Sequence, residues 1–136
     1  MVYRTIGGQR GVYVDGGMLI VDTFAATDRI PIERIKFDRI QVLDYKGSSP
    51  LRPAQRISGS SGMQEGLYYL RNGDRAYVSL RGSGSVLYIP AGPKQSVLLR
   101  TTKPSELTCA LFKSAIHKID QVHESIRPLL ADCEEI

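Results

Sequence analysis

Arginine and tyrosine side chains that could bind a ligand are concentrated in residues 52–81. The candidates are Arg56, Arg71, Arg75, Arg81, Tyr68 and Tyr77, with Arg52 nearby. Guanidinium groups form charge-assisted hydrogen bonds with phosphates and carboxylates, and tyrosine rings stack on nucleobases. On an exposed sheet face this combination would hold single-stranded nucleic acid, an anionic surface or an acidic peptide. Glu65 and Asp74 would neutralise part of the charge, so a simple solvated face is the alternative interpretation.

No arrangement of residues in the sequence predicts catalysis or a metal site. His117 and His123 fall in a predicted helix, where six positions separate side chains by about 240°, so the two rings do not converge. Cys109 is expected to be a core residue of the same helix, and Cys133 has no base near it in the sequence. We therefore predict a protein that is not an enzyme and has no metal or other cofactor. An enzyme would need an unexpected cleft that joins Cys109, a histidine and a carboxylate.

Two glycine-rich segments, residues 58–62 and 81–85, offer backbone N–H groups beside an arginine, as phosphate-binding loops do. Neither segment lies between a strand and a helix, and the pattern G-x-x-x-x-G-K-[ST] does not occur. These glycines are therefore predicted to form turns.

The best-defined local element is a β-hairpin in the stretch Arg56–Leu80, centred on Asn72-Gly73. Asn-Gly is the preferred pair for a two-residue type I′ turn, because both positions need a positive φ. That turn would place Tyr68 opposite Tyr77, so that the two rings pair on the exposed face. The apolar face would then consist of Leu67, Tyr69, Ala76, Val78 and Leu80.

The rest of the chain predicts short strands followed by one helix. Strand-like patterns occur at Val2–Ile6, Val12–Val14, Met18–Phe24, Arg29–Ile35, Arg39–Asp44, Ser85–Ile89 and Gln95–Thr101. Asp15-Gly16-Gly17 predicts a turn, and Lys46–Gln64 predicts a long loop rich in glycine, serine and proline. Apolar residues then recur every three or four positions over Pro104–Arg127, which predicts a helix that ends at Pro128.

Composition and charge set wide limits on the protein. A chain of 136 residues with a net charge of +4 is expected to form one domain, residues 1–130, with 131–136 as a short acidic tail. No apolar run approaches the roughly 20 residues of a membrane span, and the N-terminus lacks the apolar core of a signal peptide, so we predict a cytoplasmic location. In that reducing compartment Cys109 and Cys133, about 36 Å apart along a straight helix, are expected to be free thiols.

Three segments resemble the short pleckstrin-homology (PH)-like domains of bacteria and archaea. Val12–Ile35 is similar to their opening hairpin and I-P-x-x-x-I turn, here Ile30-Pro31-Ile32-Glu33-Arg34-Ile35. Arg56-Ile57-Ser58-Gly59 through Asn72-Gly73 is similar to their R-x-x-G … G-x-Y/F … N-G hairpin, and Val97–Leu107 resembles their last strand and the x-P-x-E-L/F start of their closing helix. The resemblance implies a seven-stranded barrel or orthogonal sandwich capped by one C-terminal helix. It also implies a binding or assembly module that has no catalytic residues.

We therefore predict a mainly β, PH-like, non-enzymatic binding or assembly module. Its expected partner is an unidentified protein or a second copy of the chain. One alternative is nucleic-acid or anionic-surface binding through the Arg/Tyr face of residues 67–81. The other is a homo-oligomeric scaffold that pairs through an exposed strand edge or through the helix beyond Asp120.

Overall fold

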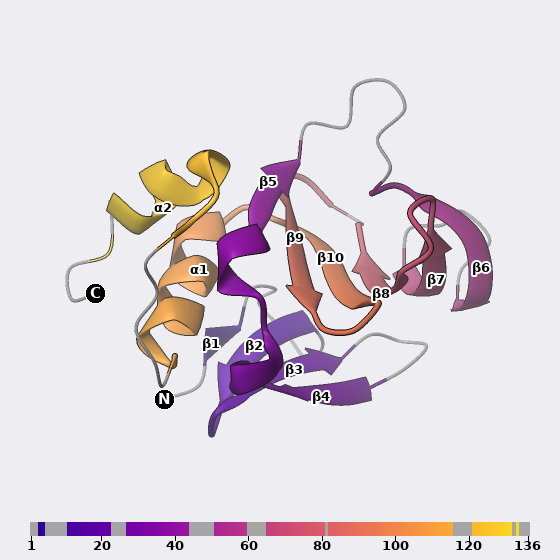
Figure 1. Ribbon diagram of the computed structural model, residues 1–136, viewed down its shortest axis with the longest axis horizontal. Coiled ribbons are helices and arrows are strands. Elements are labelled where there is room, and N and C mark those ends of the chain that lie inside the picture. The colour runs from indigo at the N-terminus through magenta and orange to yellow at the C-terminus, as the bar shows by residue number, and fades with distance from the viewer. Residues whose placement is uncertain are drawn as a thin grey trace.

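The computed structural model describes residues 3–4, 11–22, 27–43, 51–59, 65–80, 82–115, 121–131 and 133. These residues form two β-sheets with short helices at one end of the molecule (Figure 1). Within them, no helix has both the length and the apolar character needed to cross a membrane.

The first sheet is an antiparallel meander with the order β1-β2-β3-β4. Its strands are β1 (Tyr3–Arg4), β2 (Gly11–Asp15), β3 (Met18–Asp22) and β4 (Thr27–Pro31). Asp15 pairs with Met18, so β2 and β3 are joined by a two-residue turn in which Gly16 and Gly17 have φ of 58° and 76°. Positive φ at both positions is the type I′ geometry, which confirms the turn predicted here. Pro31, which lacks a donor N–H, is the last residue of the edge strand β4.

The second sheet has the order β5-β9-β10-β8-β7-β6. Its strands are β5 (Gln41–Leu43), β6 (Pro53–Gly59), β7 (Glu65–Leu70), β8 (Arg75–Ser79), β9 (Ser85–Ala91) and β10 (Gln95–Thr101). All pairs are antiparallel except β8 and β10, which are parallel. The 3-10 helices η1 (Ile32–Arg34) and η2 (Phe37–Arg39) connect the two sheets. Strand β6 lies inside the interval 46–64 that the sequence predicted to be a loop.

Hydrophobic clusters cover both faces of the second sheet. The larger cluster lies between the two sheets and under the C-terminal helix, and includes Leu19, Val21, Ile30, Ile89, Leu99 and Leu111. The smaller cluster lies on the opposite face, because its members alternate with those of the first along β8, β9 and β10. It consists of Tyr68, Leu70, Ala76, Val78, Val86, Tyr88 and Leu98.

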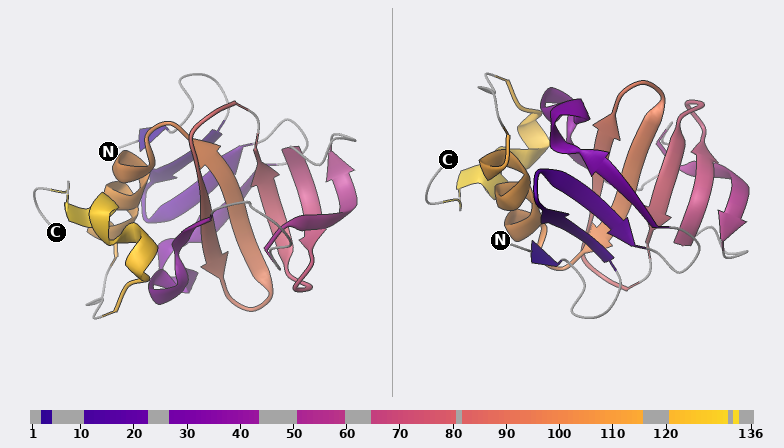
Figure 2. Two further views of the ribbon diagram at one scale, coloured as in Figure 1. Left: turned by 90° about the horizontal axis from the view of Figure 1, so that it is seen from above. Right: turned by 90° about the horizontal axis from the view of Figure 1, so that it is seen from below.

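The C-terminal segment differs from its prediction. Helix α1 (Pro104–Lys113) begins at Pro104 as expected, but it ends at Lys113 instead of continuing to Arg127. The chain then turns back, and η3 (Glu124–Ile126) and α2 (Arg127–Ala131) pack beside α1 and β5 (Figures 1 and 2). Pro128 lies in the first turn of α2, where no donor N–H is needed, so it does not end a helix.

A disulfide bond between Cys109 and Cys133 fixes this reversal, so the prediction of free thiols is wrong. The Cα atoms are 5.7 Å apart, because α2 packs beside α1. The boundary predicted at residue 131 falls at the last residue of α2, and Cys133 beyond it is bonded to α1.

The mainly β class with a C-terminal helix is therefore confirmed, but the predicted barrel is not. The sheets do not close into a barrel, and the described residues form a four-stranded and a six-stranded sheet, more strands than the seven predicted.

Candidate ligand-binding pocket

The β7–β8 hairpin has a three-residue turn instead of the predicted two-residue turn. Leu70 and Asp74 close the turn: Leu70 N donates to Asp74 O at 2.8 Å. Within the turn, Gly73 N donates to Leu70 O at 3.0 Å. Gly73 has a φ of 94°, whereas Asn72 keeps a negative φ. The Asn72 side chain instead accepts a hydrogen bond from Asp74 N at 3.0 Å, which stabilises the longer turn.

This one-residue shift moves the side chains of β7 to the opposite face relative to β8, since successive side chains of a strand point to opposite sides. Ala76 and Val78 on β8 are buried as predicted. Tyr68 lies opposite Ala76 and is completely buried, so the predicted exposed Tyr68–Tyr77 pair is wrong. Tyr77 instead lies opposite Leu67, and Arg75 lies opposite Tyr69. The predicted apolar positions Leu67 and Tyr69 are half-buried and 40% exposed, respectively.

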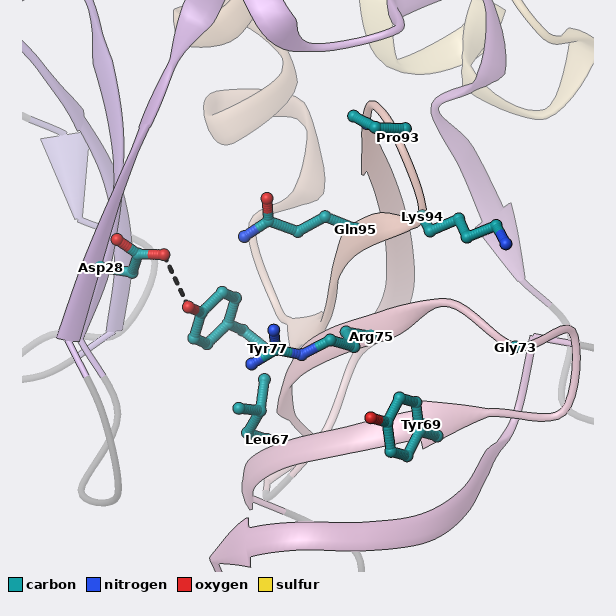
Figure 3. Close-up of a pocket in the computed structure, with 9 residues that line it drawn as sticks. All are labelled: Asp28, Leu67, Tyr69, Gly73, Arg75, Tyr77, Pro93, Lys94 and Gln95. Atoms are coloured by element: carbon teal, nitrogen blue, oxygen red, sulfur yellow. Dashed lines mark hydrogen bonds between the residues drawn. The ribbon is translucent and has the colours of Figure 1, made fainter.

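The hairpin face that carries Leu67, Tyr69, Arg75 and Tyr77 forms the floor of an open pocket of about 420 Å³ (Figure 3). Its lining residues come from β4, from the β7–β8 hairpin with its turn, from the turn between β9 and β10, and from the first residue of β10. They are Asp28, Leu67, Tyr69, Gly73, Arg75, Tyr77, Pro93, Lys94 and Gln95. The volume lies within the range of small-molecule sites in proteins.

A hydrogen bond joins the two sheets at one wall of the pocket. The Tyr77 hydroxyl donates to Asp28 Oδ2 at 2.6 Å, and Asp28 Oδ1 accepts from Arg29 N at 2.8 Å. Burial raises the pKa of Tyr77 to about 12, and the hydrogen bond to Asp28 adds to the shift. At neutral pH the phenol is therefore protonated, and both carboxylate oxygens of Asp28 already accept hydrogen bonds.

Arg75 and Gln95 contribute the polar groups of the pocket floor. They are neighbours on the parallel strands β8 and β10, and their side chains point to the same side, toward Asp28 (Figure 3). Arg75 is exposed, and no described residue makes an ion pair or hydrogen bond with its guanidinium group. This guanidinium group is therefore available to a ligand.

Lys94 lies at the rim, in the three-residue turn between Ala91 and Gln95. It has a φ of 56°, a left-handed conformation that costs a non-glycine residue about 1 kcal/mol. Its carbonyl oxygen accepts from Arg75 N at 2.9 Å, so this turn also fixes the backbone at the start of β8. The Lys94 side chain points away from those of Arg75 and Gln95 (Figure 3).

Only part of the predicted arginine and tyrosine group is brought together. Arg75 and Tyr77 both line the pocket, whereas Arg71 is exposed in the hairpin turn. Arg56 is exposed on β6 opposite Tyr68, on the face away from the pocket. Arg81 lies outside the described residues.

The sequence did not identify the other pocket residues. Tyr69 and Leu67 would have been found if the hairpin register had been right, because both alternate with the buried Tyr68. Asp28 and Gln95 are far from the hairpin in sequence, and no local pattern connects them to it. Gly92-Pro93 is typical of a turn, but nothing in the sequence marks the next residue, Lys94, as part of a pocket.

The glycine-rich segment after β8 and the histidine in the described residues take part in hydrogen bonds that stabilise the fold. Arg100 donates to the carbonyl groups of Leu80 and Gly84 at 3.2 and 3.1 Å, so its guanidinium group links the end of β8 to the start of β9. His123 caps η3 by accepting from Ser125 N at 3.1 Å, while His117 lies outside the described residues. Across the described ranges, no three His, Cys, Asp or Glu side chains are grouped to hold a metal ion.

Comparison of the chain with models of known protein families, with curated proteins and with solved structures found no match. The site is therefore interpreted from its own geometry and chemistry.

Proposed function

We propose that the protein is a non-enzymatic binding module that holds a small anionic ligand with an apolar body in the pocket between β4 and the β7–β8 hairpin. The observation that carries this proposal is the Arg75 guanidinium group, which lies without a described partner beside the half-buried ring of Tyr77. The lining combines charged and amide groups with the side chains of Leu67, Pro93 and two tyrosines, so one ligand could contact both kinds of group.

A non-enzymatic role is supported by the state of the two groups that could otherwise transfer a proton. Tyr77 has a pKa raised to about 12, so at neutral pH it is a poor base and a poor acid. Asp28 accepts hydrogen bonds at both carboxylate oxygens.

An extended nucleic-acid strand is supported less well than a small ligand. The basic residues expected to follow such a strand are divided between the pocket floor (Arg75), the hairpin turn (Arg71) and the opposite face (Arg56). Tyr68, one of the two rings expected to stack on bases, is completely buried.

The PH-like assignment remains part of the proposal. It is supported by the opening meander of short strands and by α1, which begins at the Lys103-Pro104-Ser105-Glu106-Leu107 segment that resembles the family. The disulfide bears on the proposed location, because stable disulfides are typical of oxidising compartments. It gives no support to a cytoplasmic location.

Three anions with the same phenyl body, benzoate, benzenesulfonate and phenyl phosphate, would test the proposed site. In spectra of nitrogen-15-labelled protein, at least one of them should shift the backbone amide signals of Leu67, Tyr69, Arg75, Tyr77 and Gln95. Binding should weaken as salt is added, since the charged partner is exposed.

Arg75→Glu should weaken this binding at least about tenfold, because it removes a charge-assisted hydrogen bond and adds a repulsive charge. Arg71→Glu is the matched control: it makes the same charge change in the hairpin turn, outside the pocket lining. The proposal fails if none of the three anions shifts the pocket signals, or if the two variants weaken binding equally.

A further inference from the structure

We infer that the anionic group recognised by the pocket is a carboxylate on an aromatic or aliphatic body, held by Arg75 and Gln95. This inference rests on the proposed function and specifies the class of its ligand. It follows from the shape of the polar groups, from their charge and from the apolar lining.

The shape of the polar groups fits a planar anion. Arg75 and Gln95 are register partners on adjacent strands, and both side chains reach into the pocket on the same side (Figure 3). A guanidinium group donates two parallel hydrogen bonds to a carboxylate, and a carboxamide N–H can donate a further one in a similar plane.

The charge of the pocket fits a single negative charge better than two. Of the two lining cations, only Arg75 points into the pocket, because the Lys94 side chain points away. The Asp28 carboxylate lies on the opposite wall, where it would repel a phosphate dianion more strongly than a carboxylate. Each Asp28 oxygen already accepts one hydrogen bond, from Tyr77 or from the backbone N–H of Arg29, so this carboxylate is held in place on that wall.

The remaining lining residues fit the apolar body of such an acid. Leu67, Pro93 and the rings of Tyr69 and Tyr77 surround the polar pair. The Tyr77 hydroxyl already donates to Asp28, so this residue presents its ring to a ligand. Tyr69 is one of only two large apolar side chains in the described residues that are clearly exposed, as expected for a ring that a ligand would cover.

The same chemistry could come from a free small acid or from the C-terminal carboxylate of a peptide. Two pairs of probes separate these sources: benzoate against benzamide, and the tripeptide Ala-Ala-Phe against its C-terminal amide. Both carboxylates should bind at least about tenfold more tightly than their amides, because the amides lose the charge-assisted bond to Arg75. Tighter binding of benzoate would indicate a free acid, and tighter binding of the tripeptide would indicate a peptide C-terminus.

Phenyl phosphate separates this inference from the proposed function. We expect it to bind no more tightly than benzoate at neutral pH. If it binds at least tenfold more tightly at the same pocket signals, the carboxylate inference is overturned while the small-anion proposal stands. If none of the probes shifts the pocket signals, both fail.

A neutral variant tests the role of Gln95 without changing the charge. Gln95→Leu keeps the size of the side chain and removes its amide, so benzoate binding should weaken about fivefold or more. Lys94→Gln is the matched control at the next position, and it should weaken binding less than twofold because its side chain points away. A larger effect of Lys94→Gln than of Gln95→Leu would contradict the proposed geometry.

Discussion

The space between the two sheets is closed at one end and open at the other. At the closed end, α1, η3 and α2 cover it, and Phe37 and Phe112 meet edge to face with ring centroids 5.0 Å apart. At the open end, the edge strand β4 leaves β7 and β8 uncovered (Figure 2). The pocket lies at this end (Figure 3). The space between the two sheets thus contains the hydrophobic core at one end and the proposed binding pocket at the other.

The two ends differ in the side chains that fill them. Leu107, Leu111 and Ile126 at the closed end are completely buried aliphatic residues. The open end uses Tyr69, Tyr77 and charged residues, which tolerate water on one side. The closed end therefore contributes mainly to stability, whereas the open end can exchange water for a ligand at little cost to the fold.

The largest contrast between the two ends is expected when the same charge is introduced into each. Leu111→Asp should abolish folding, because an unpaired carboxylate at a completely buried site costs several kcal/mol of a total stability of about 5–15 kcal/mol. Leu67→Asp, at the half-buried pocket floor, should reduce the free energy of unfolding by about 1 kcal/mol. Circular dichroism during urea unfolding measures both, and loss of the fold in the Leu67 variant would contradict the distinction.

Removing the disulfide should have the next largest effect, and only at the closed end. Cys109→Ser with Cys133→Ser should lower the free energy of unfolding by about 3 kcal/mol, since the bond closes a loop whose ends are 24 positions apart. Amide signals should change in α1, α2 and β5, while benzoate binding stays unchanged. A stability difference below about 0.5 kcal/mol would contradict the expected contribution of the disulfide. Weaker benzoate binding would show that the two ends are coupled.

The smallest effect is expected from Tyr77→Phe at the open end. Loss of the hydrogen bond to Asp28 should cost about 1 kcal/mol at neutral pH. The folded pKa of Tyr77, about 12, lies above its ordinary value of 10.0, so its contribution is complete below pH 10 and is lost as the pH rises toward 12. The variant should therefore lose less stability than the natural chain between pH 10 and pH 12.

Tyr88→Phe provides the control for this pH dependence. Tyr88 also has a pKa raised to about 12, but it donates to Asp74 at 3.2 Å on the other face of the sheet. Its replacement should reduce the alkaline loss of stability in the same way without changing benzoate binding. If Tyr77→Phe leaves the alkaline loss unchanged, the pKa of Tyr77 is not raised in the folded protein.

Local patterns predicted those features that depend on neighbouring residues alone. Gly16-Gly17 forms the expected turn, and its type is I′ because both residues accept a positive φ without a steric penalty. Pro104 begins α1 as predicted. The alternation in Gln95–Thr101 forms β10 with the predicted bounds.

The hairpin face, the helix length and the disulfide could not be predicted in the same way. Asn72-Gly73 is compatible with a two-residue or a three-residue turn, and the longer turn buries Tyr68, Leu70 and Val78 in one cluster. The helical pattern continues past Lys113, but turning back there lets Ile126 and α2 cover the core and lets Ser125 Oγ accept a hydrogen bond from Val42 N at 2.9 Å.

The sequence alone determined the β class, the tight turns and the start of the helix, because backbone geometry and local side-chain alternation decide these features. Tertiary structure decided which residues of β7 face the pocket, that the two cysteines meet, and where a ligand can enter. The physical reason is that the pocket depends on contacts such as Tyr77–Asp28, which lie 49 residues apart in the chain. Long-range packing selects between local alternatives that differ by only about 1 kcal/mol, so the same arginines and tyrosines could form either an exposed strip or a pocket.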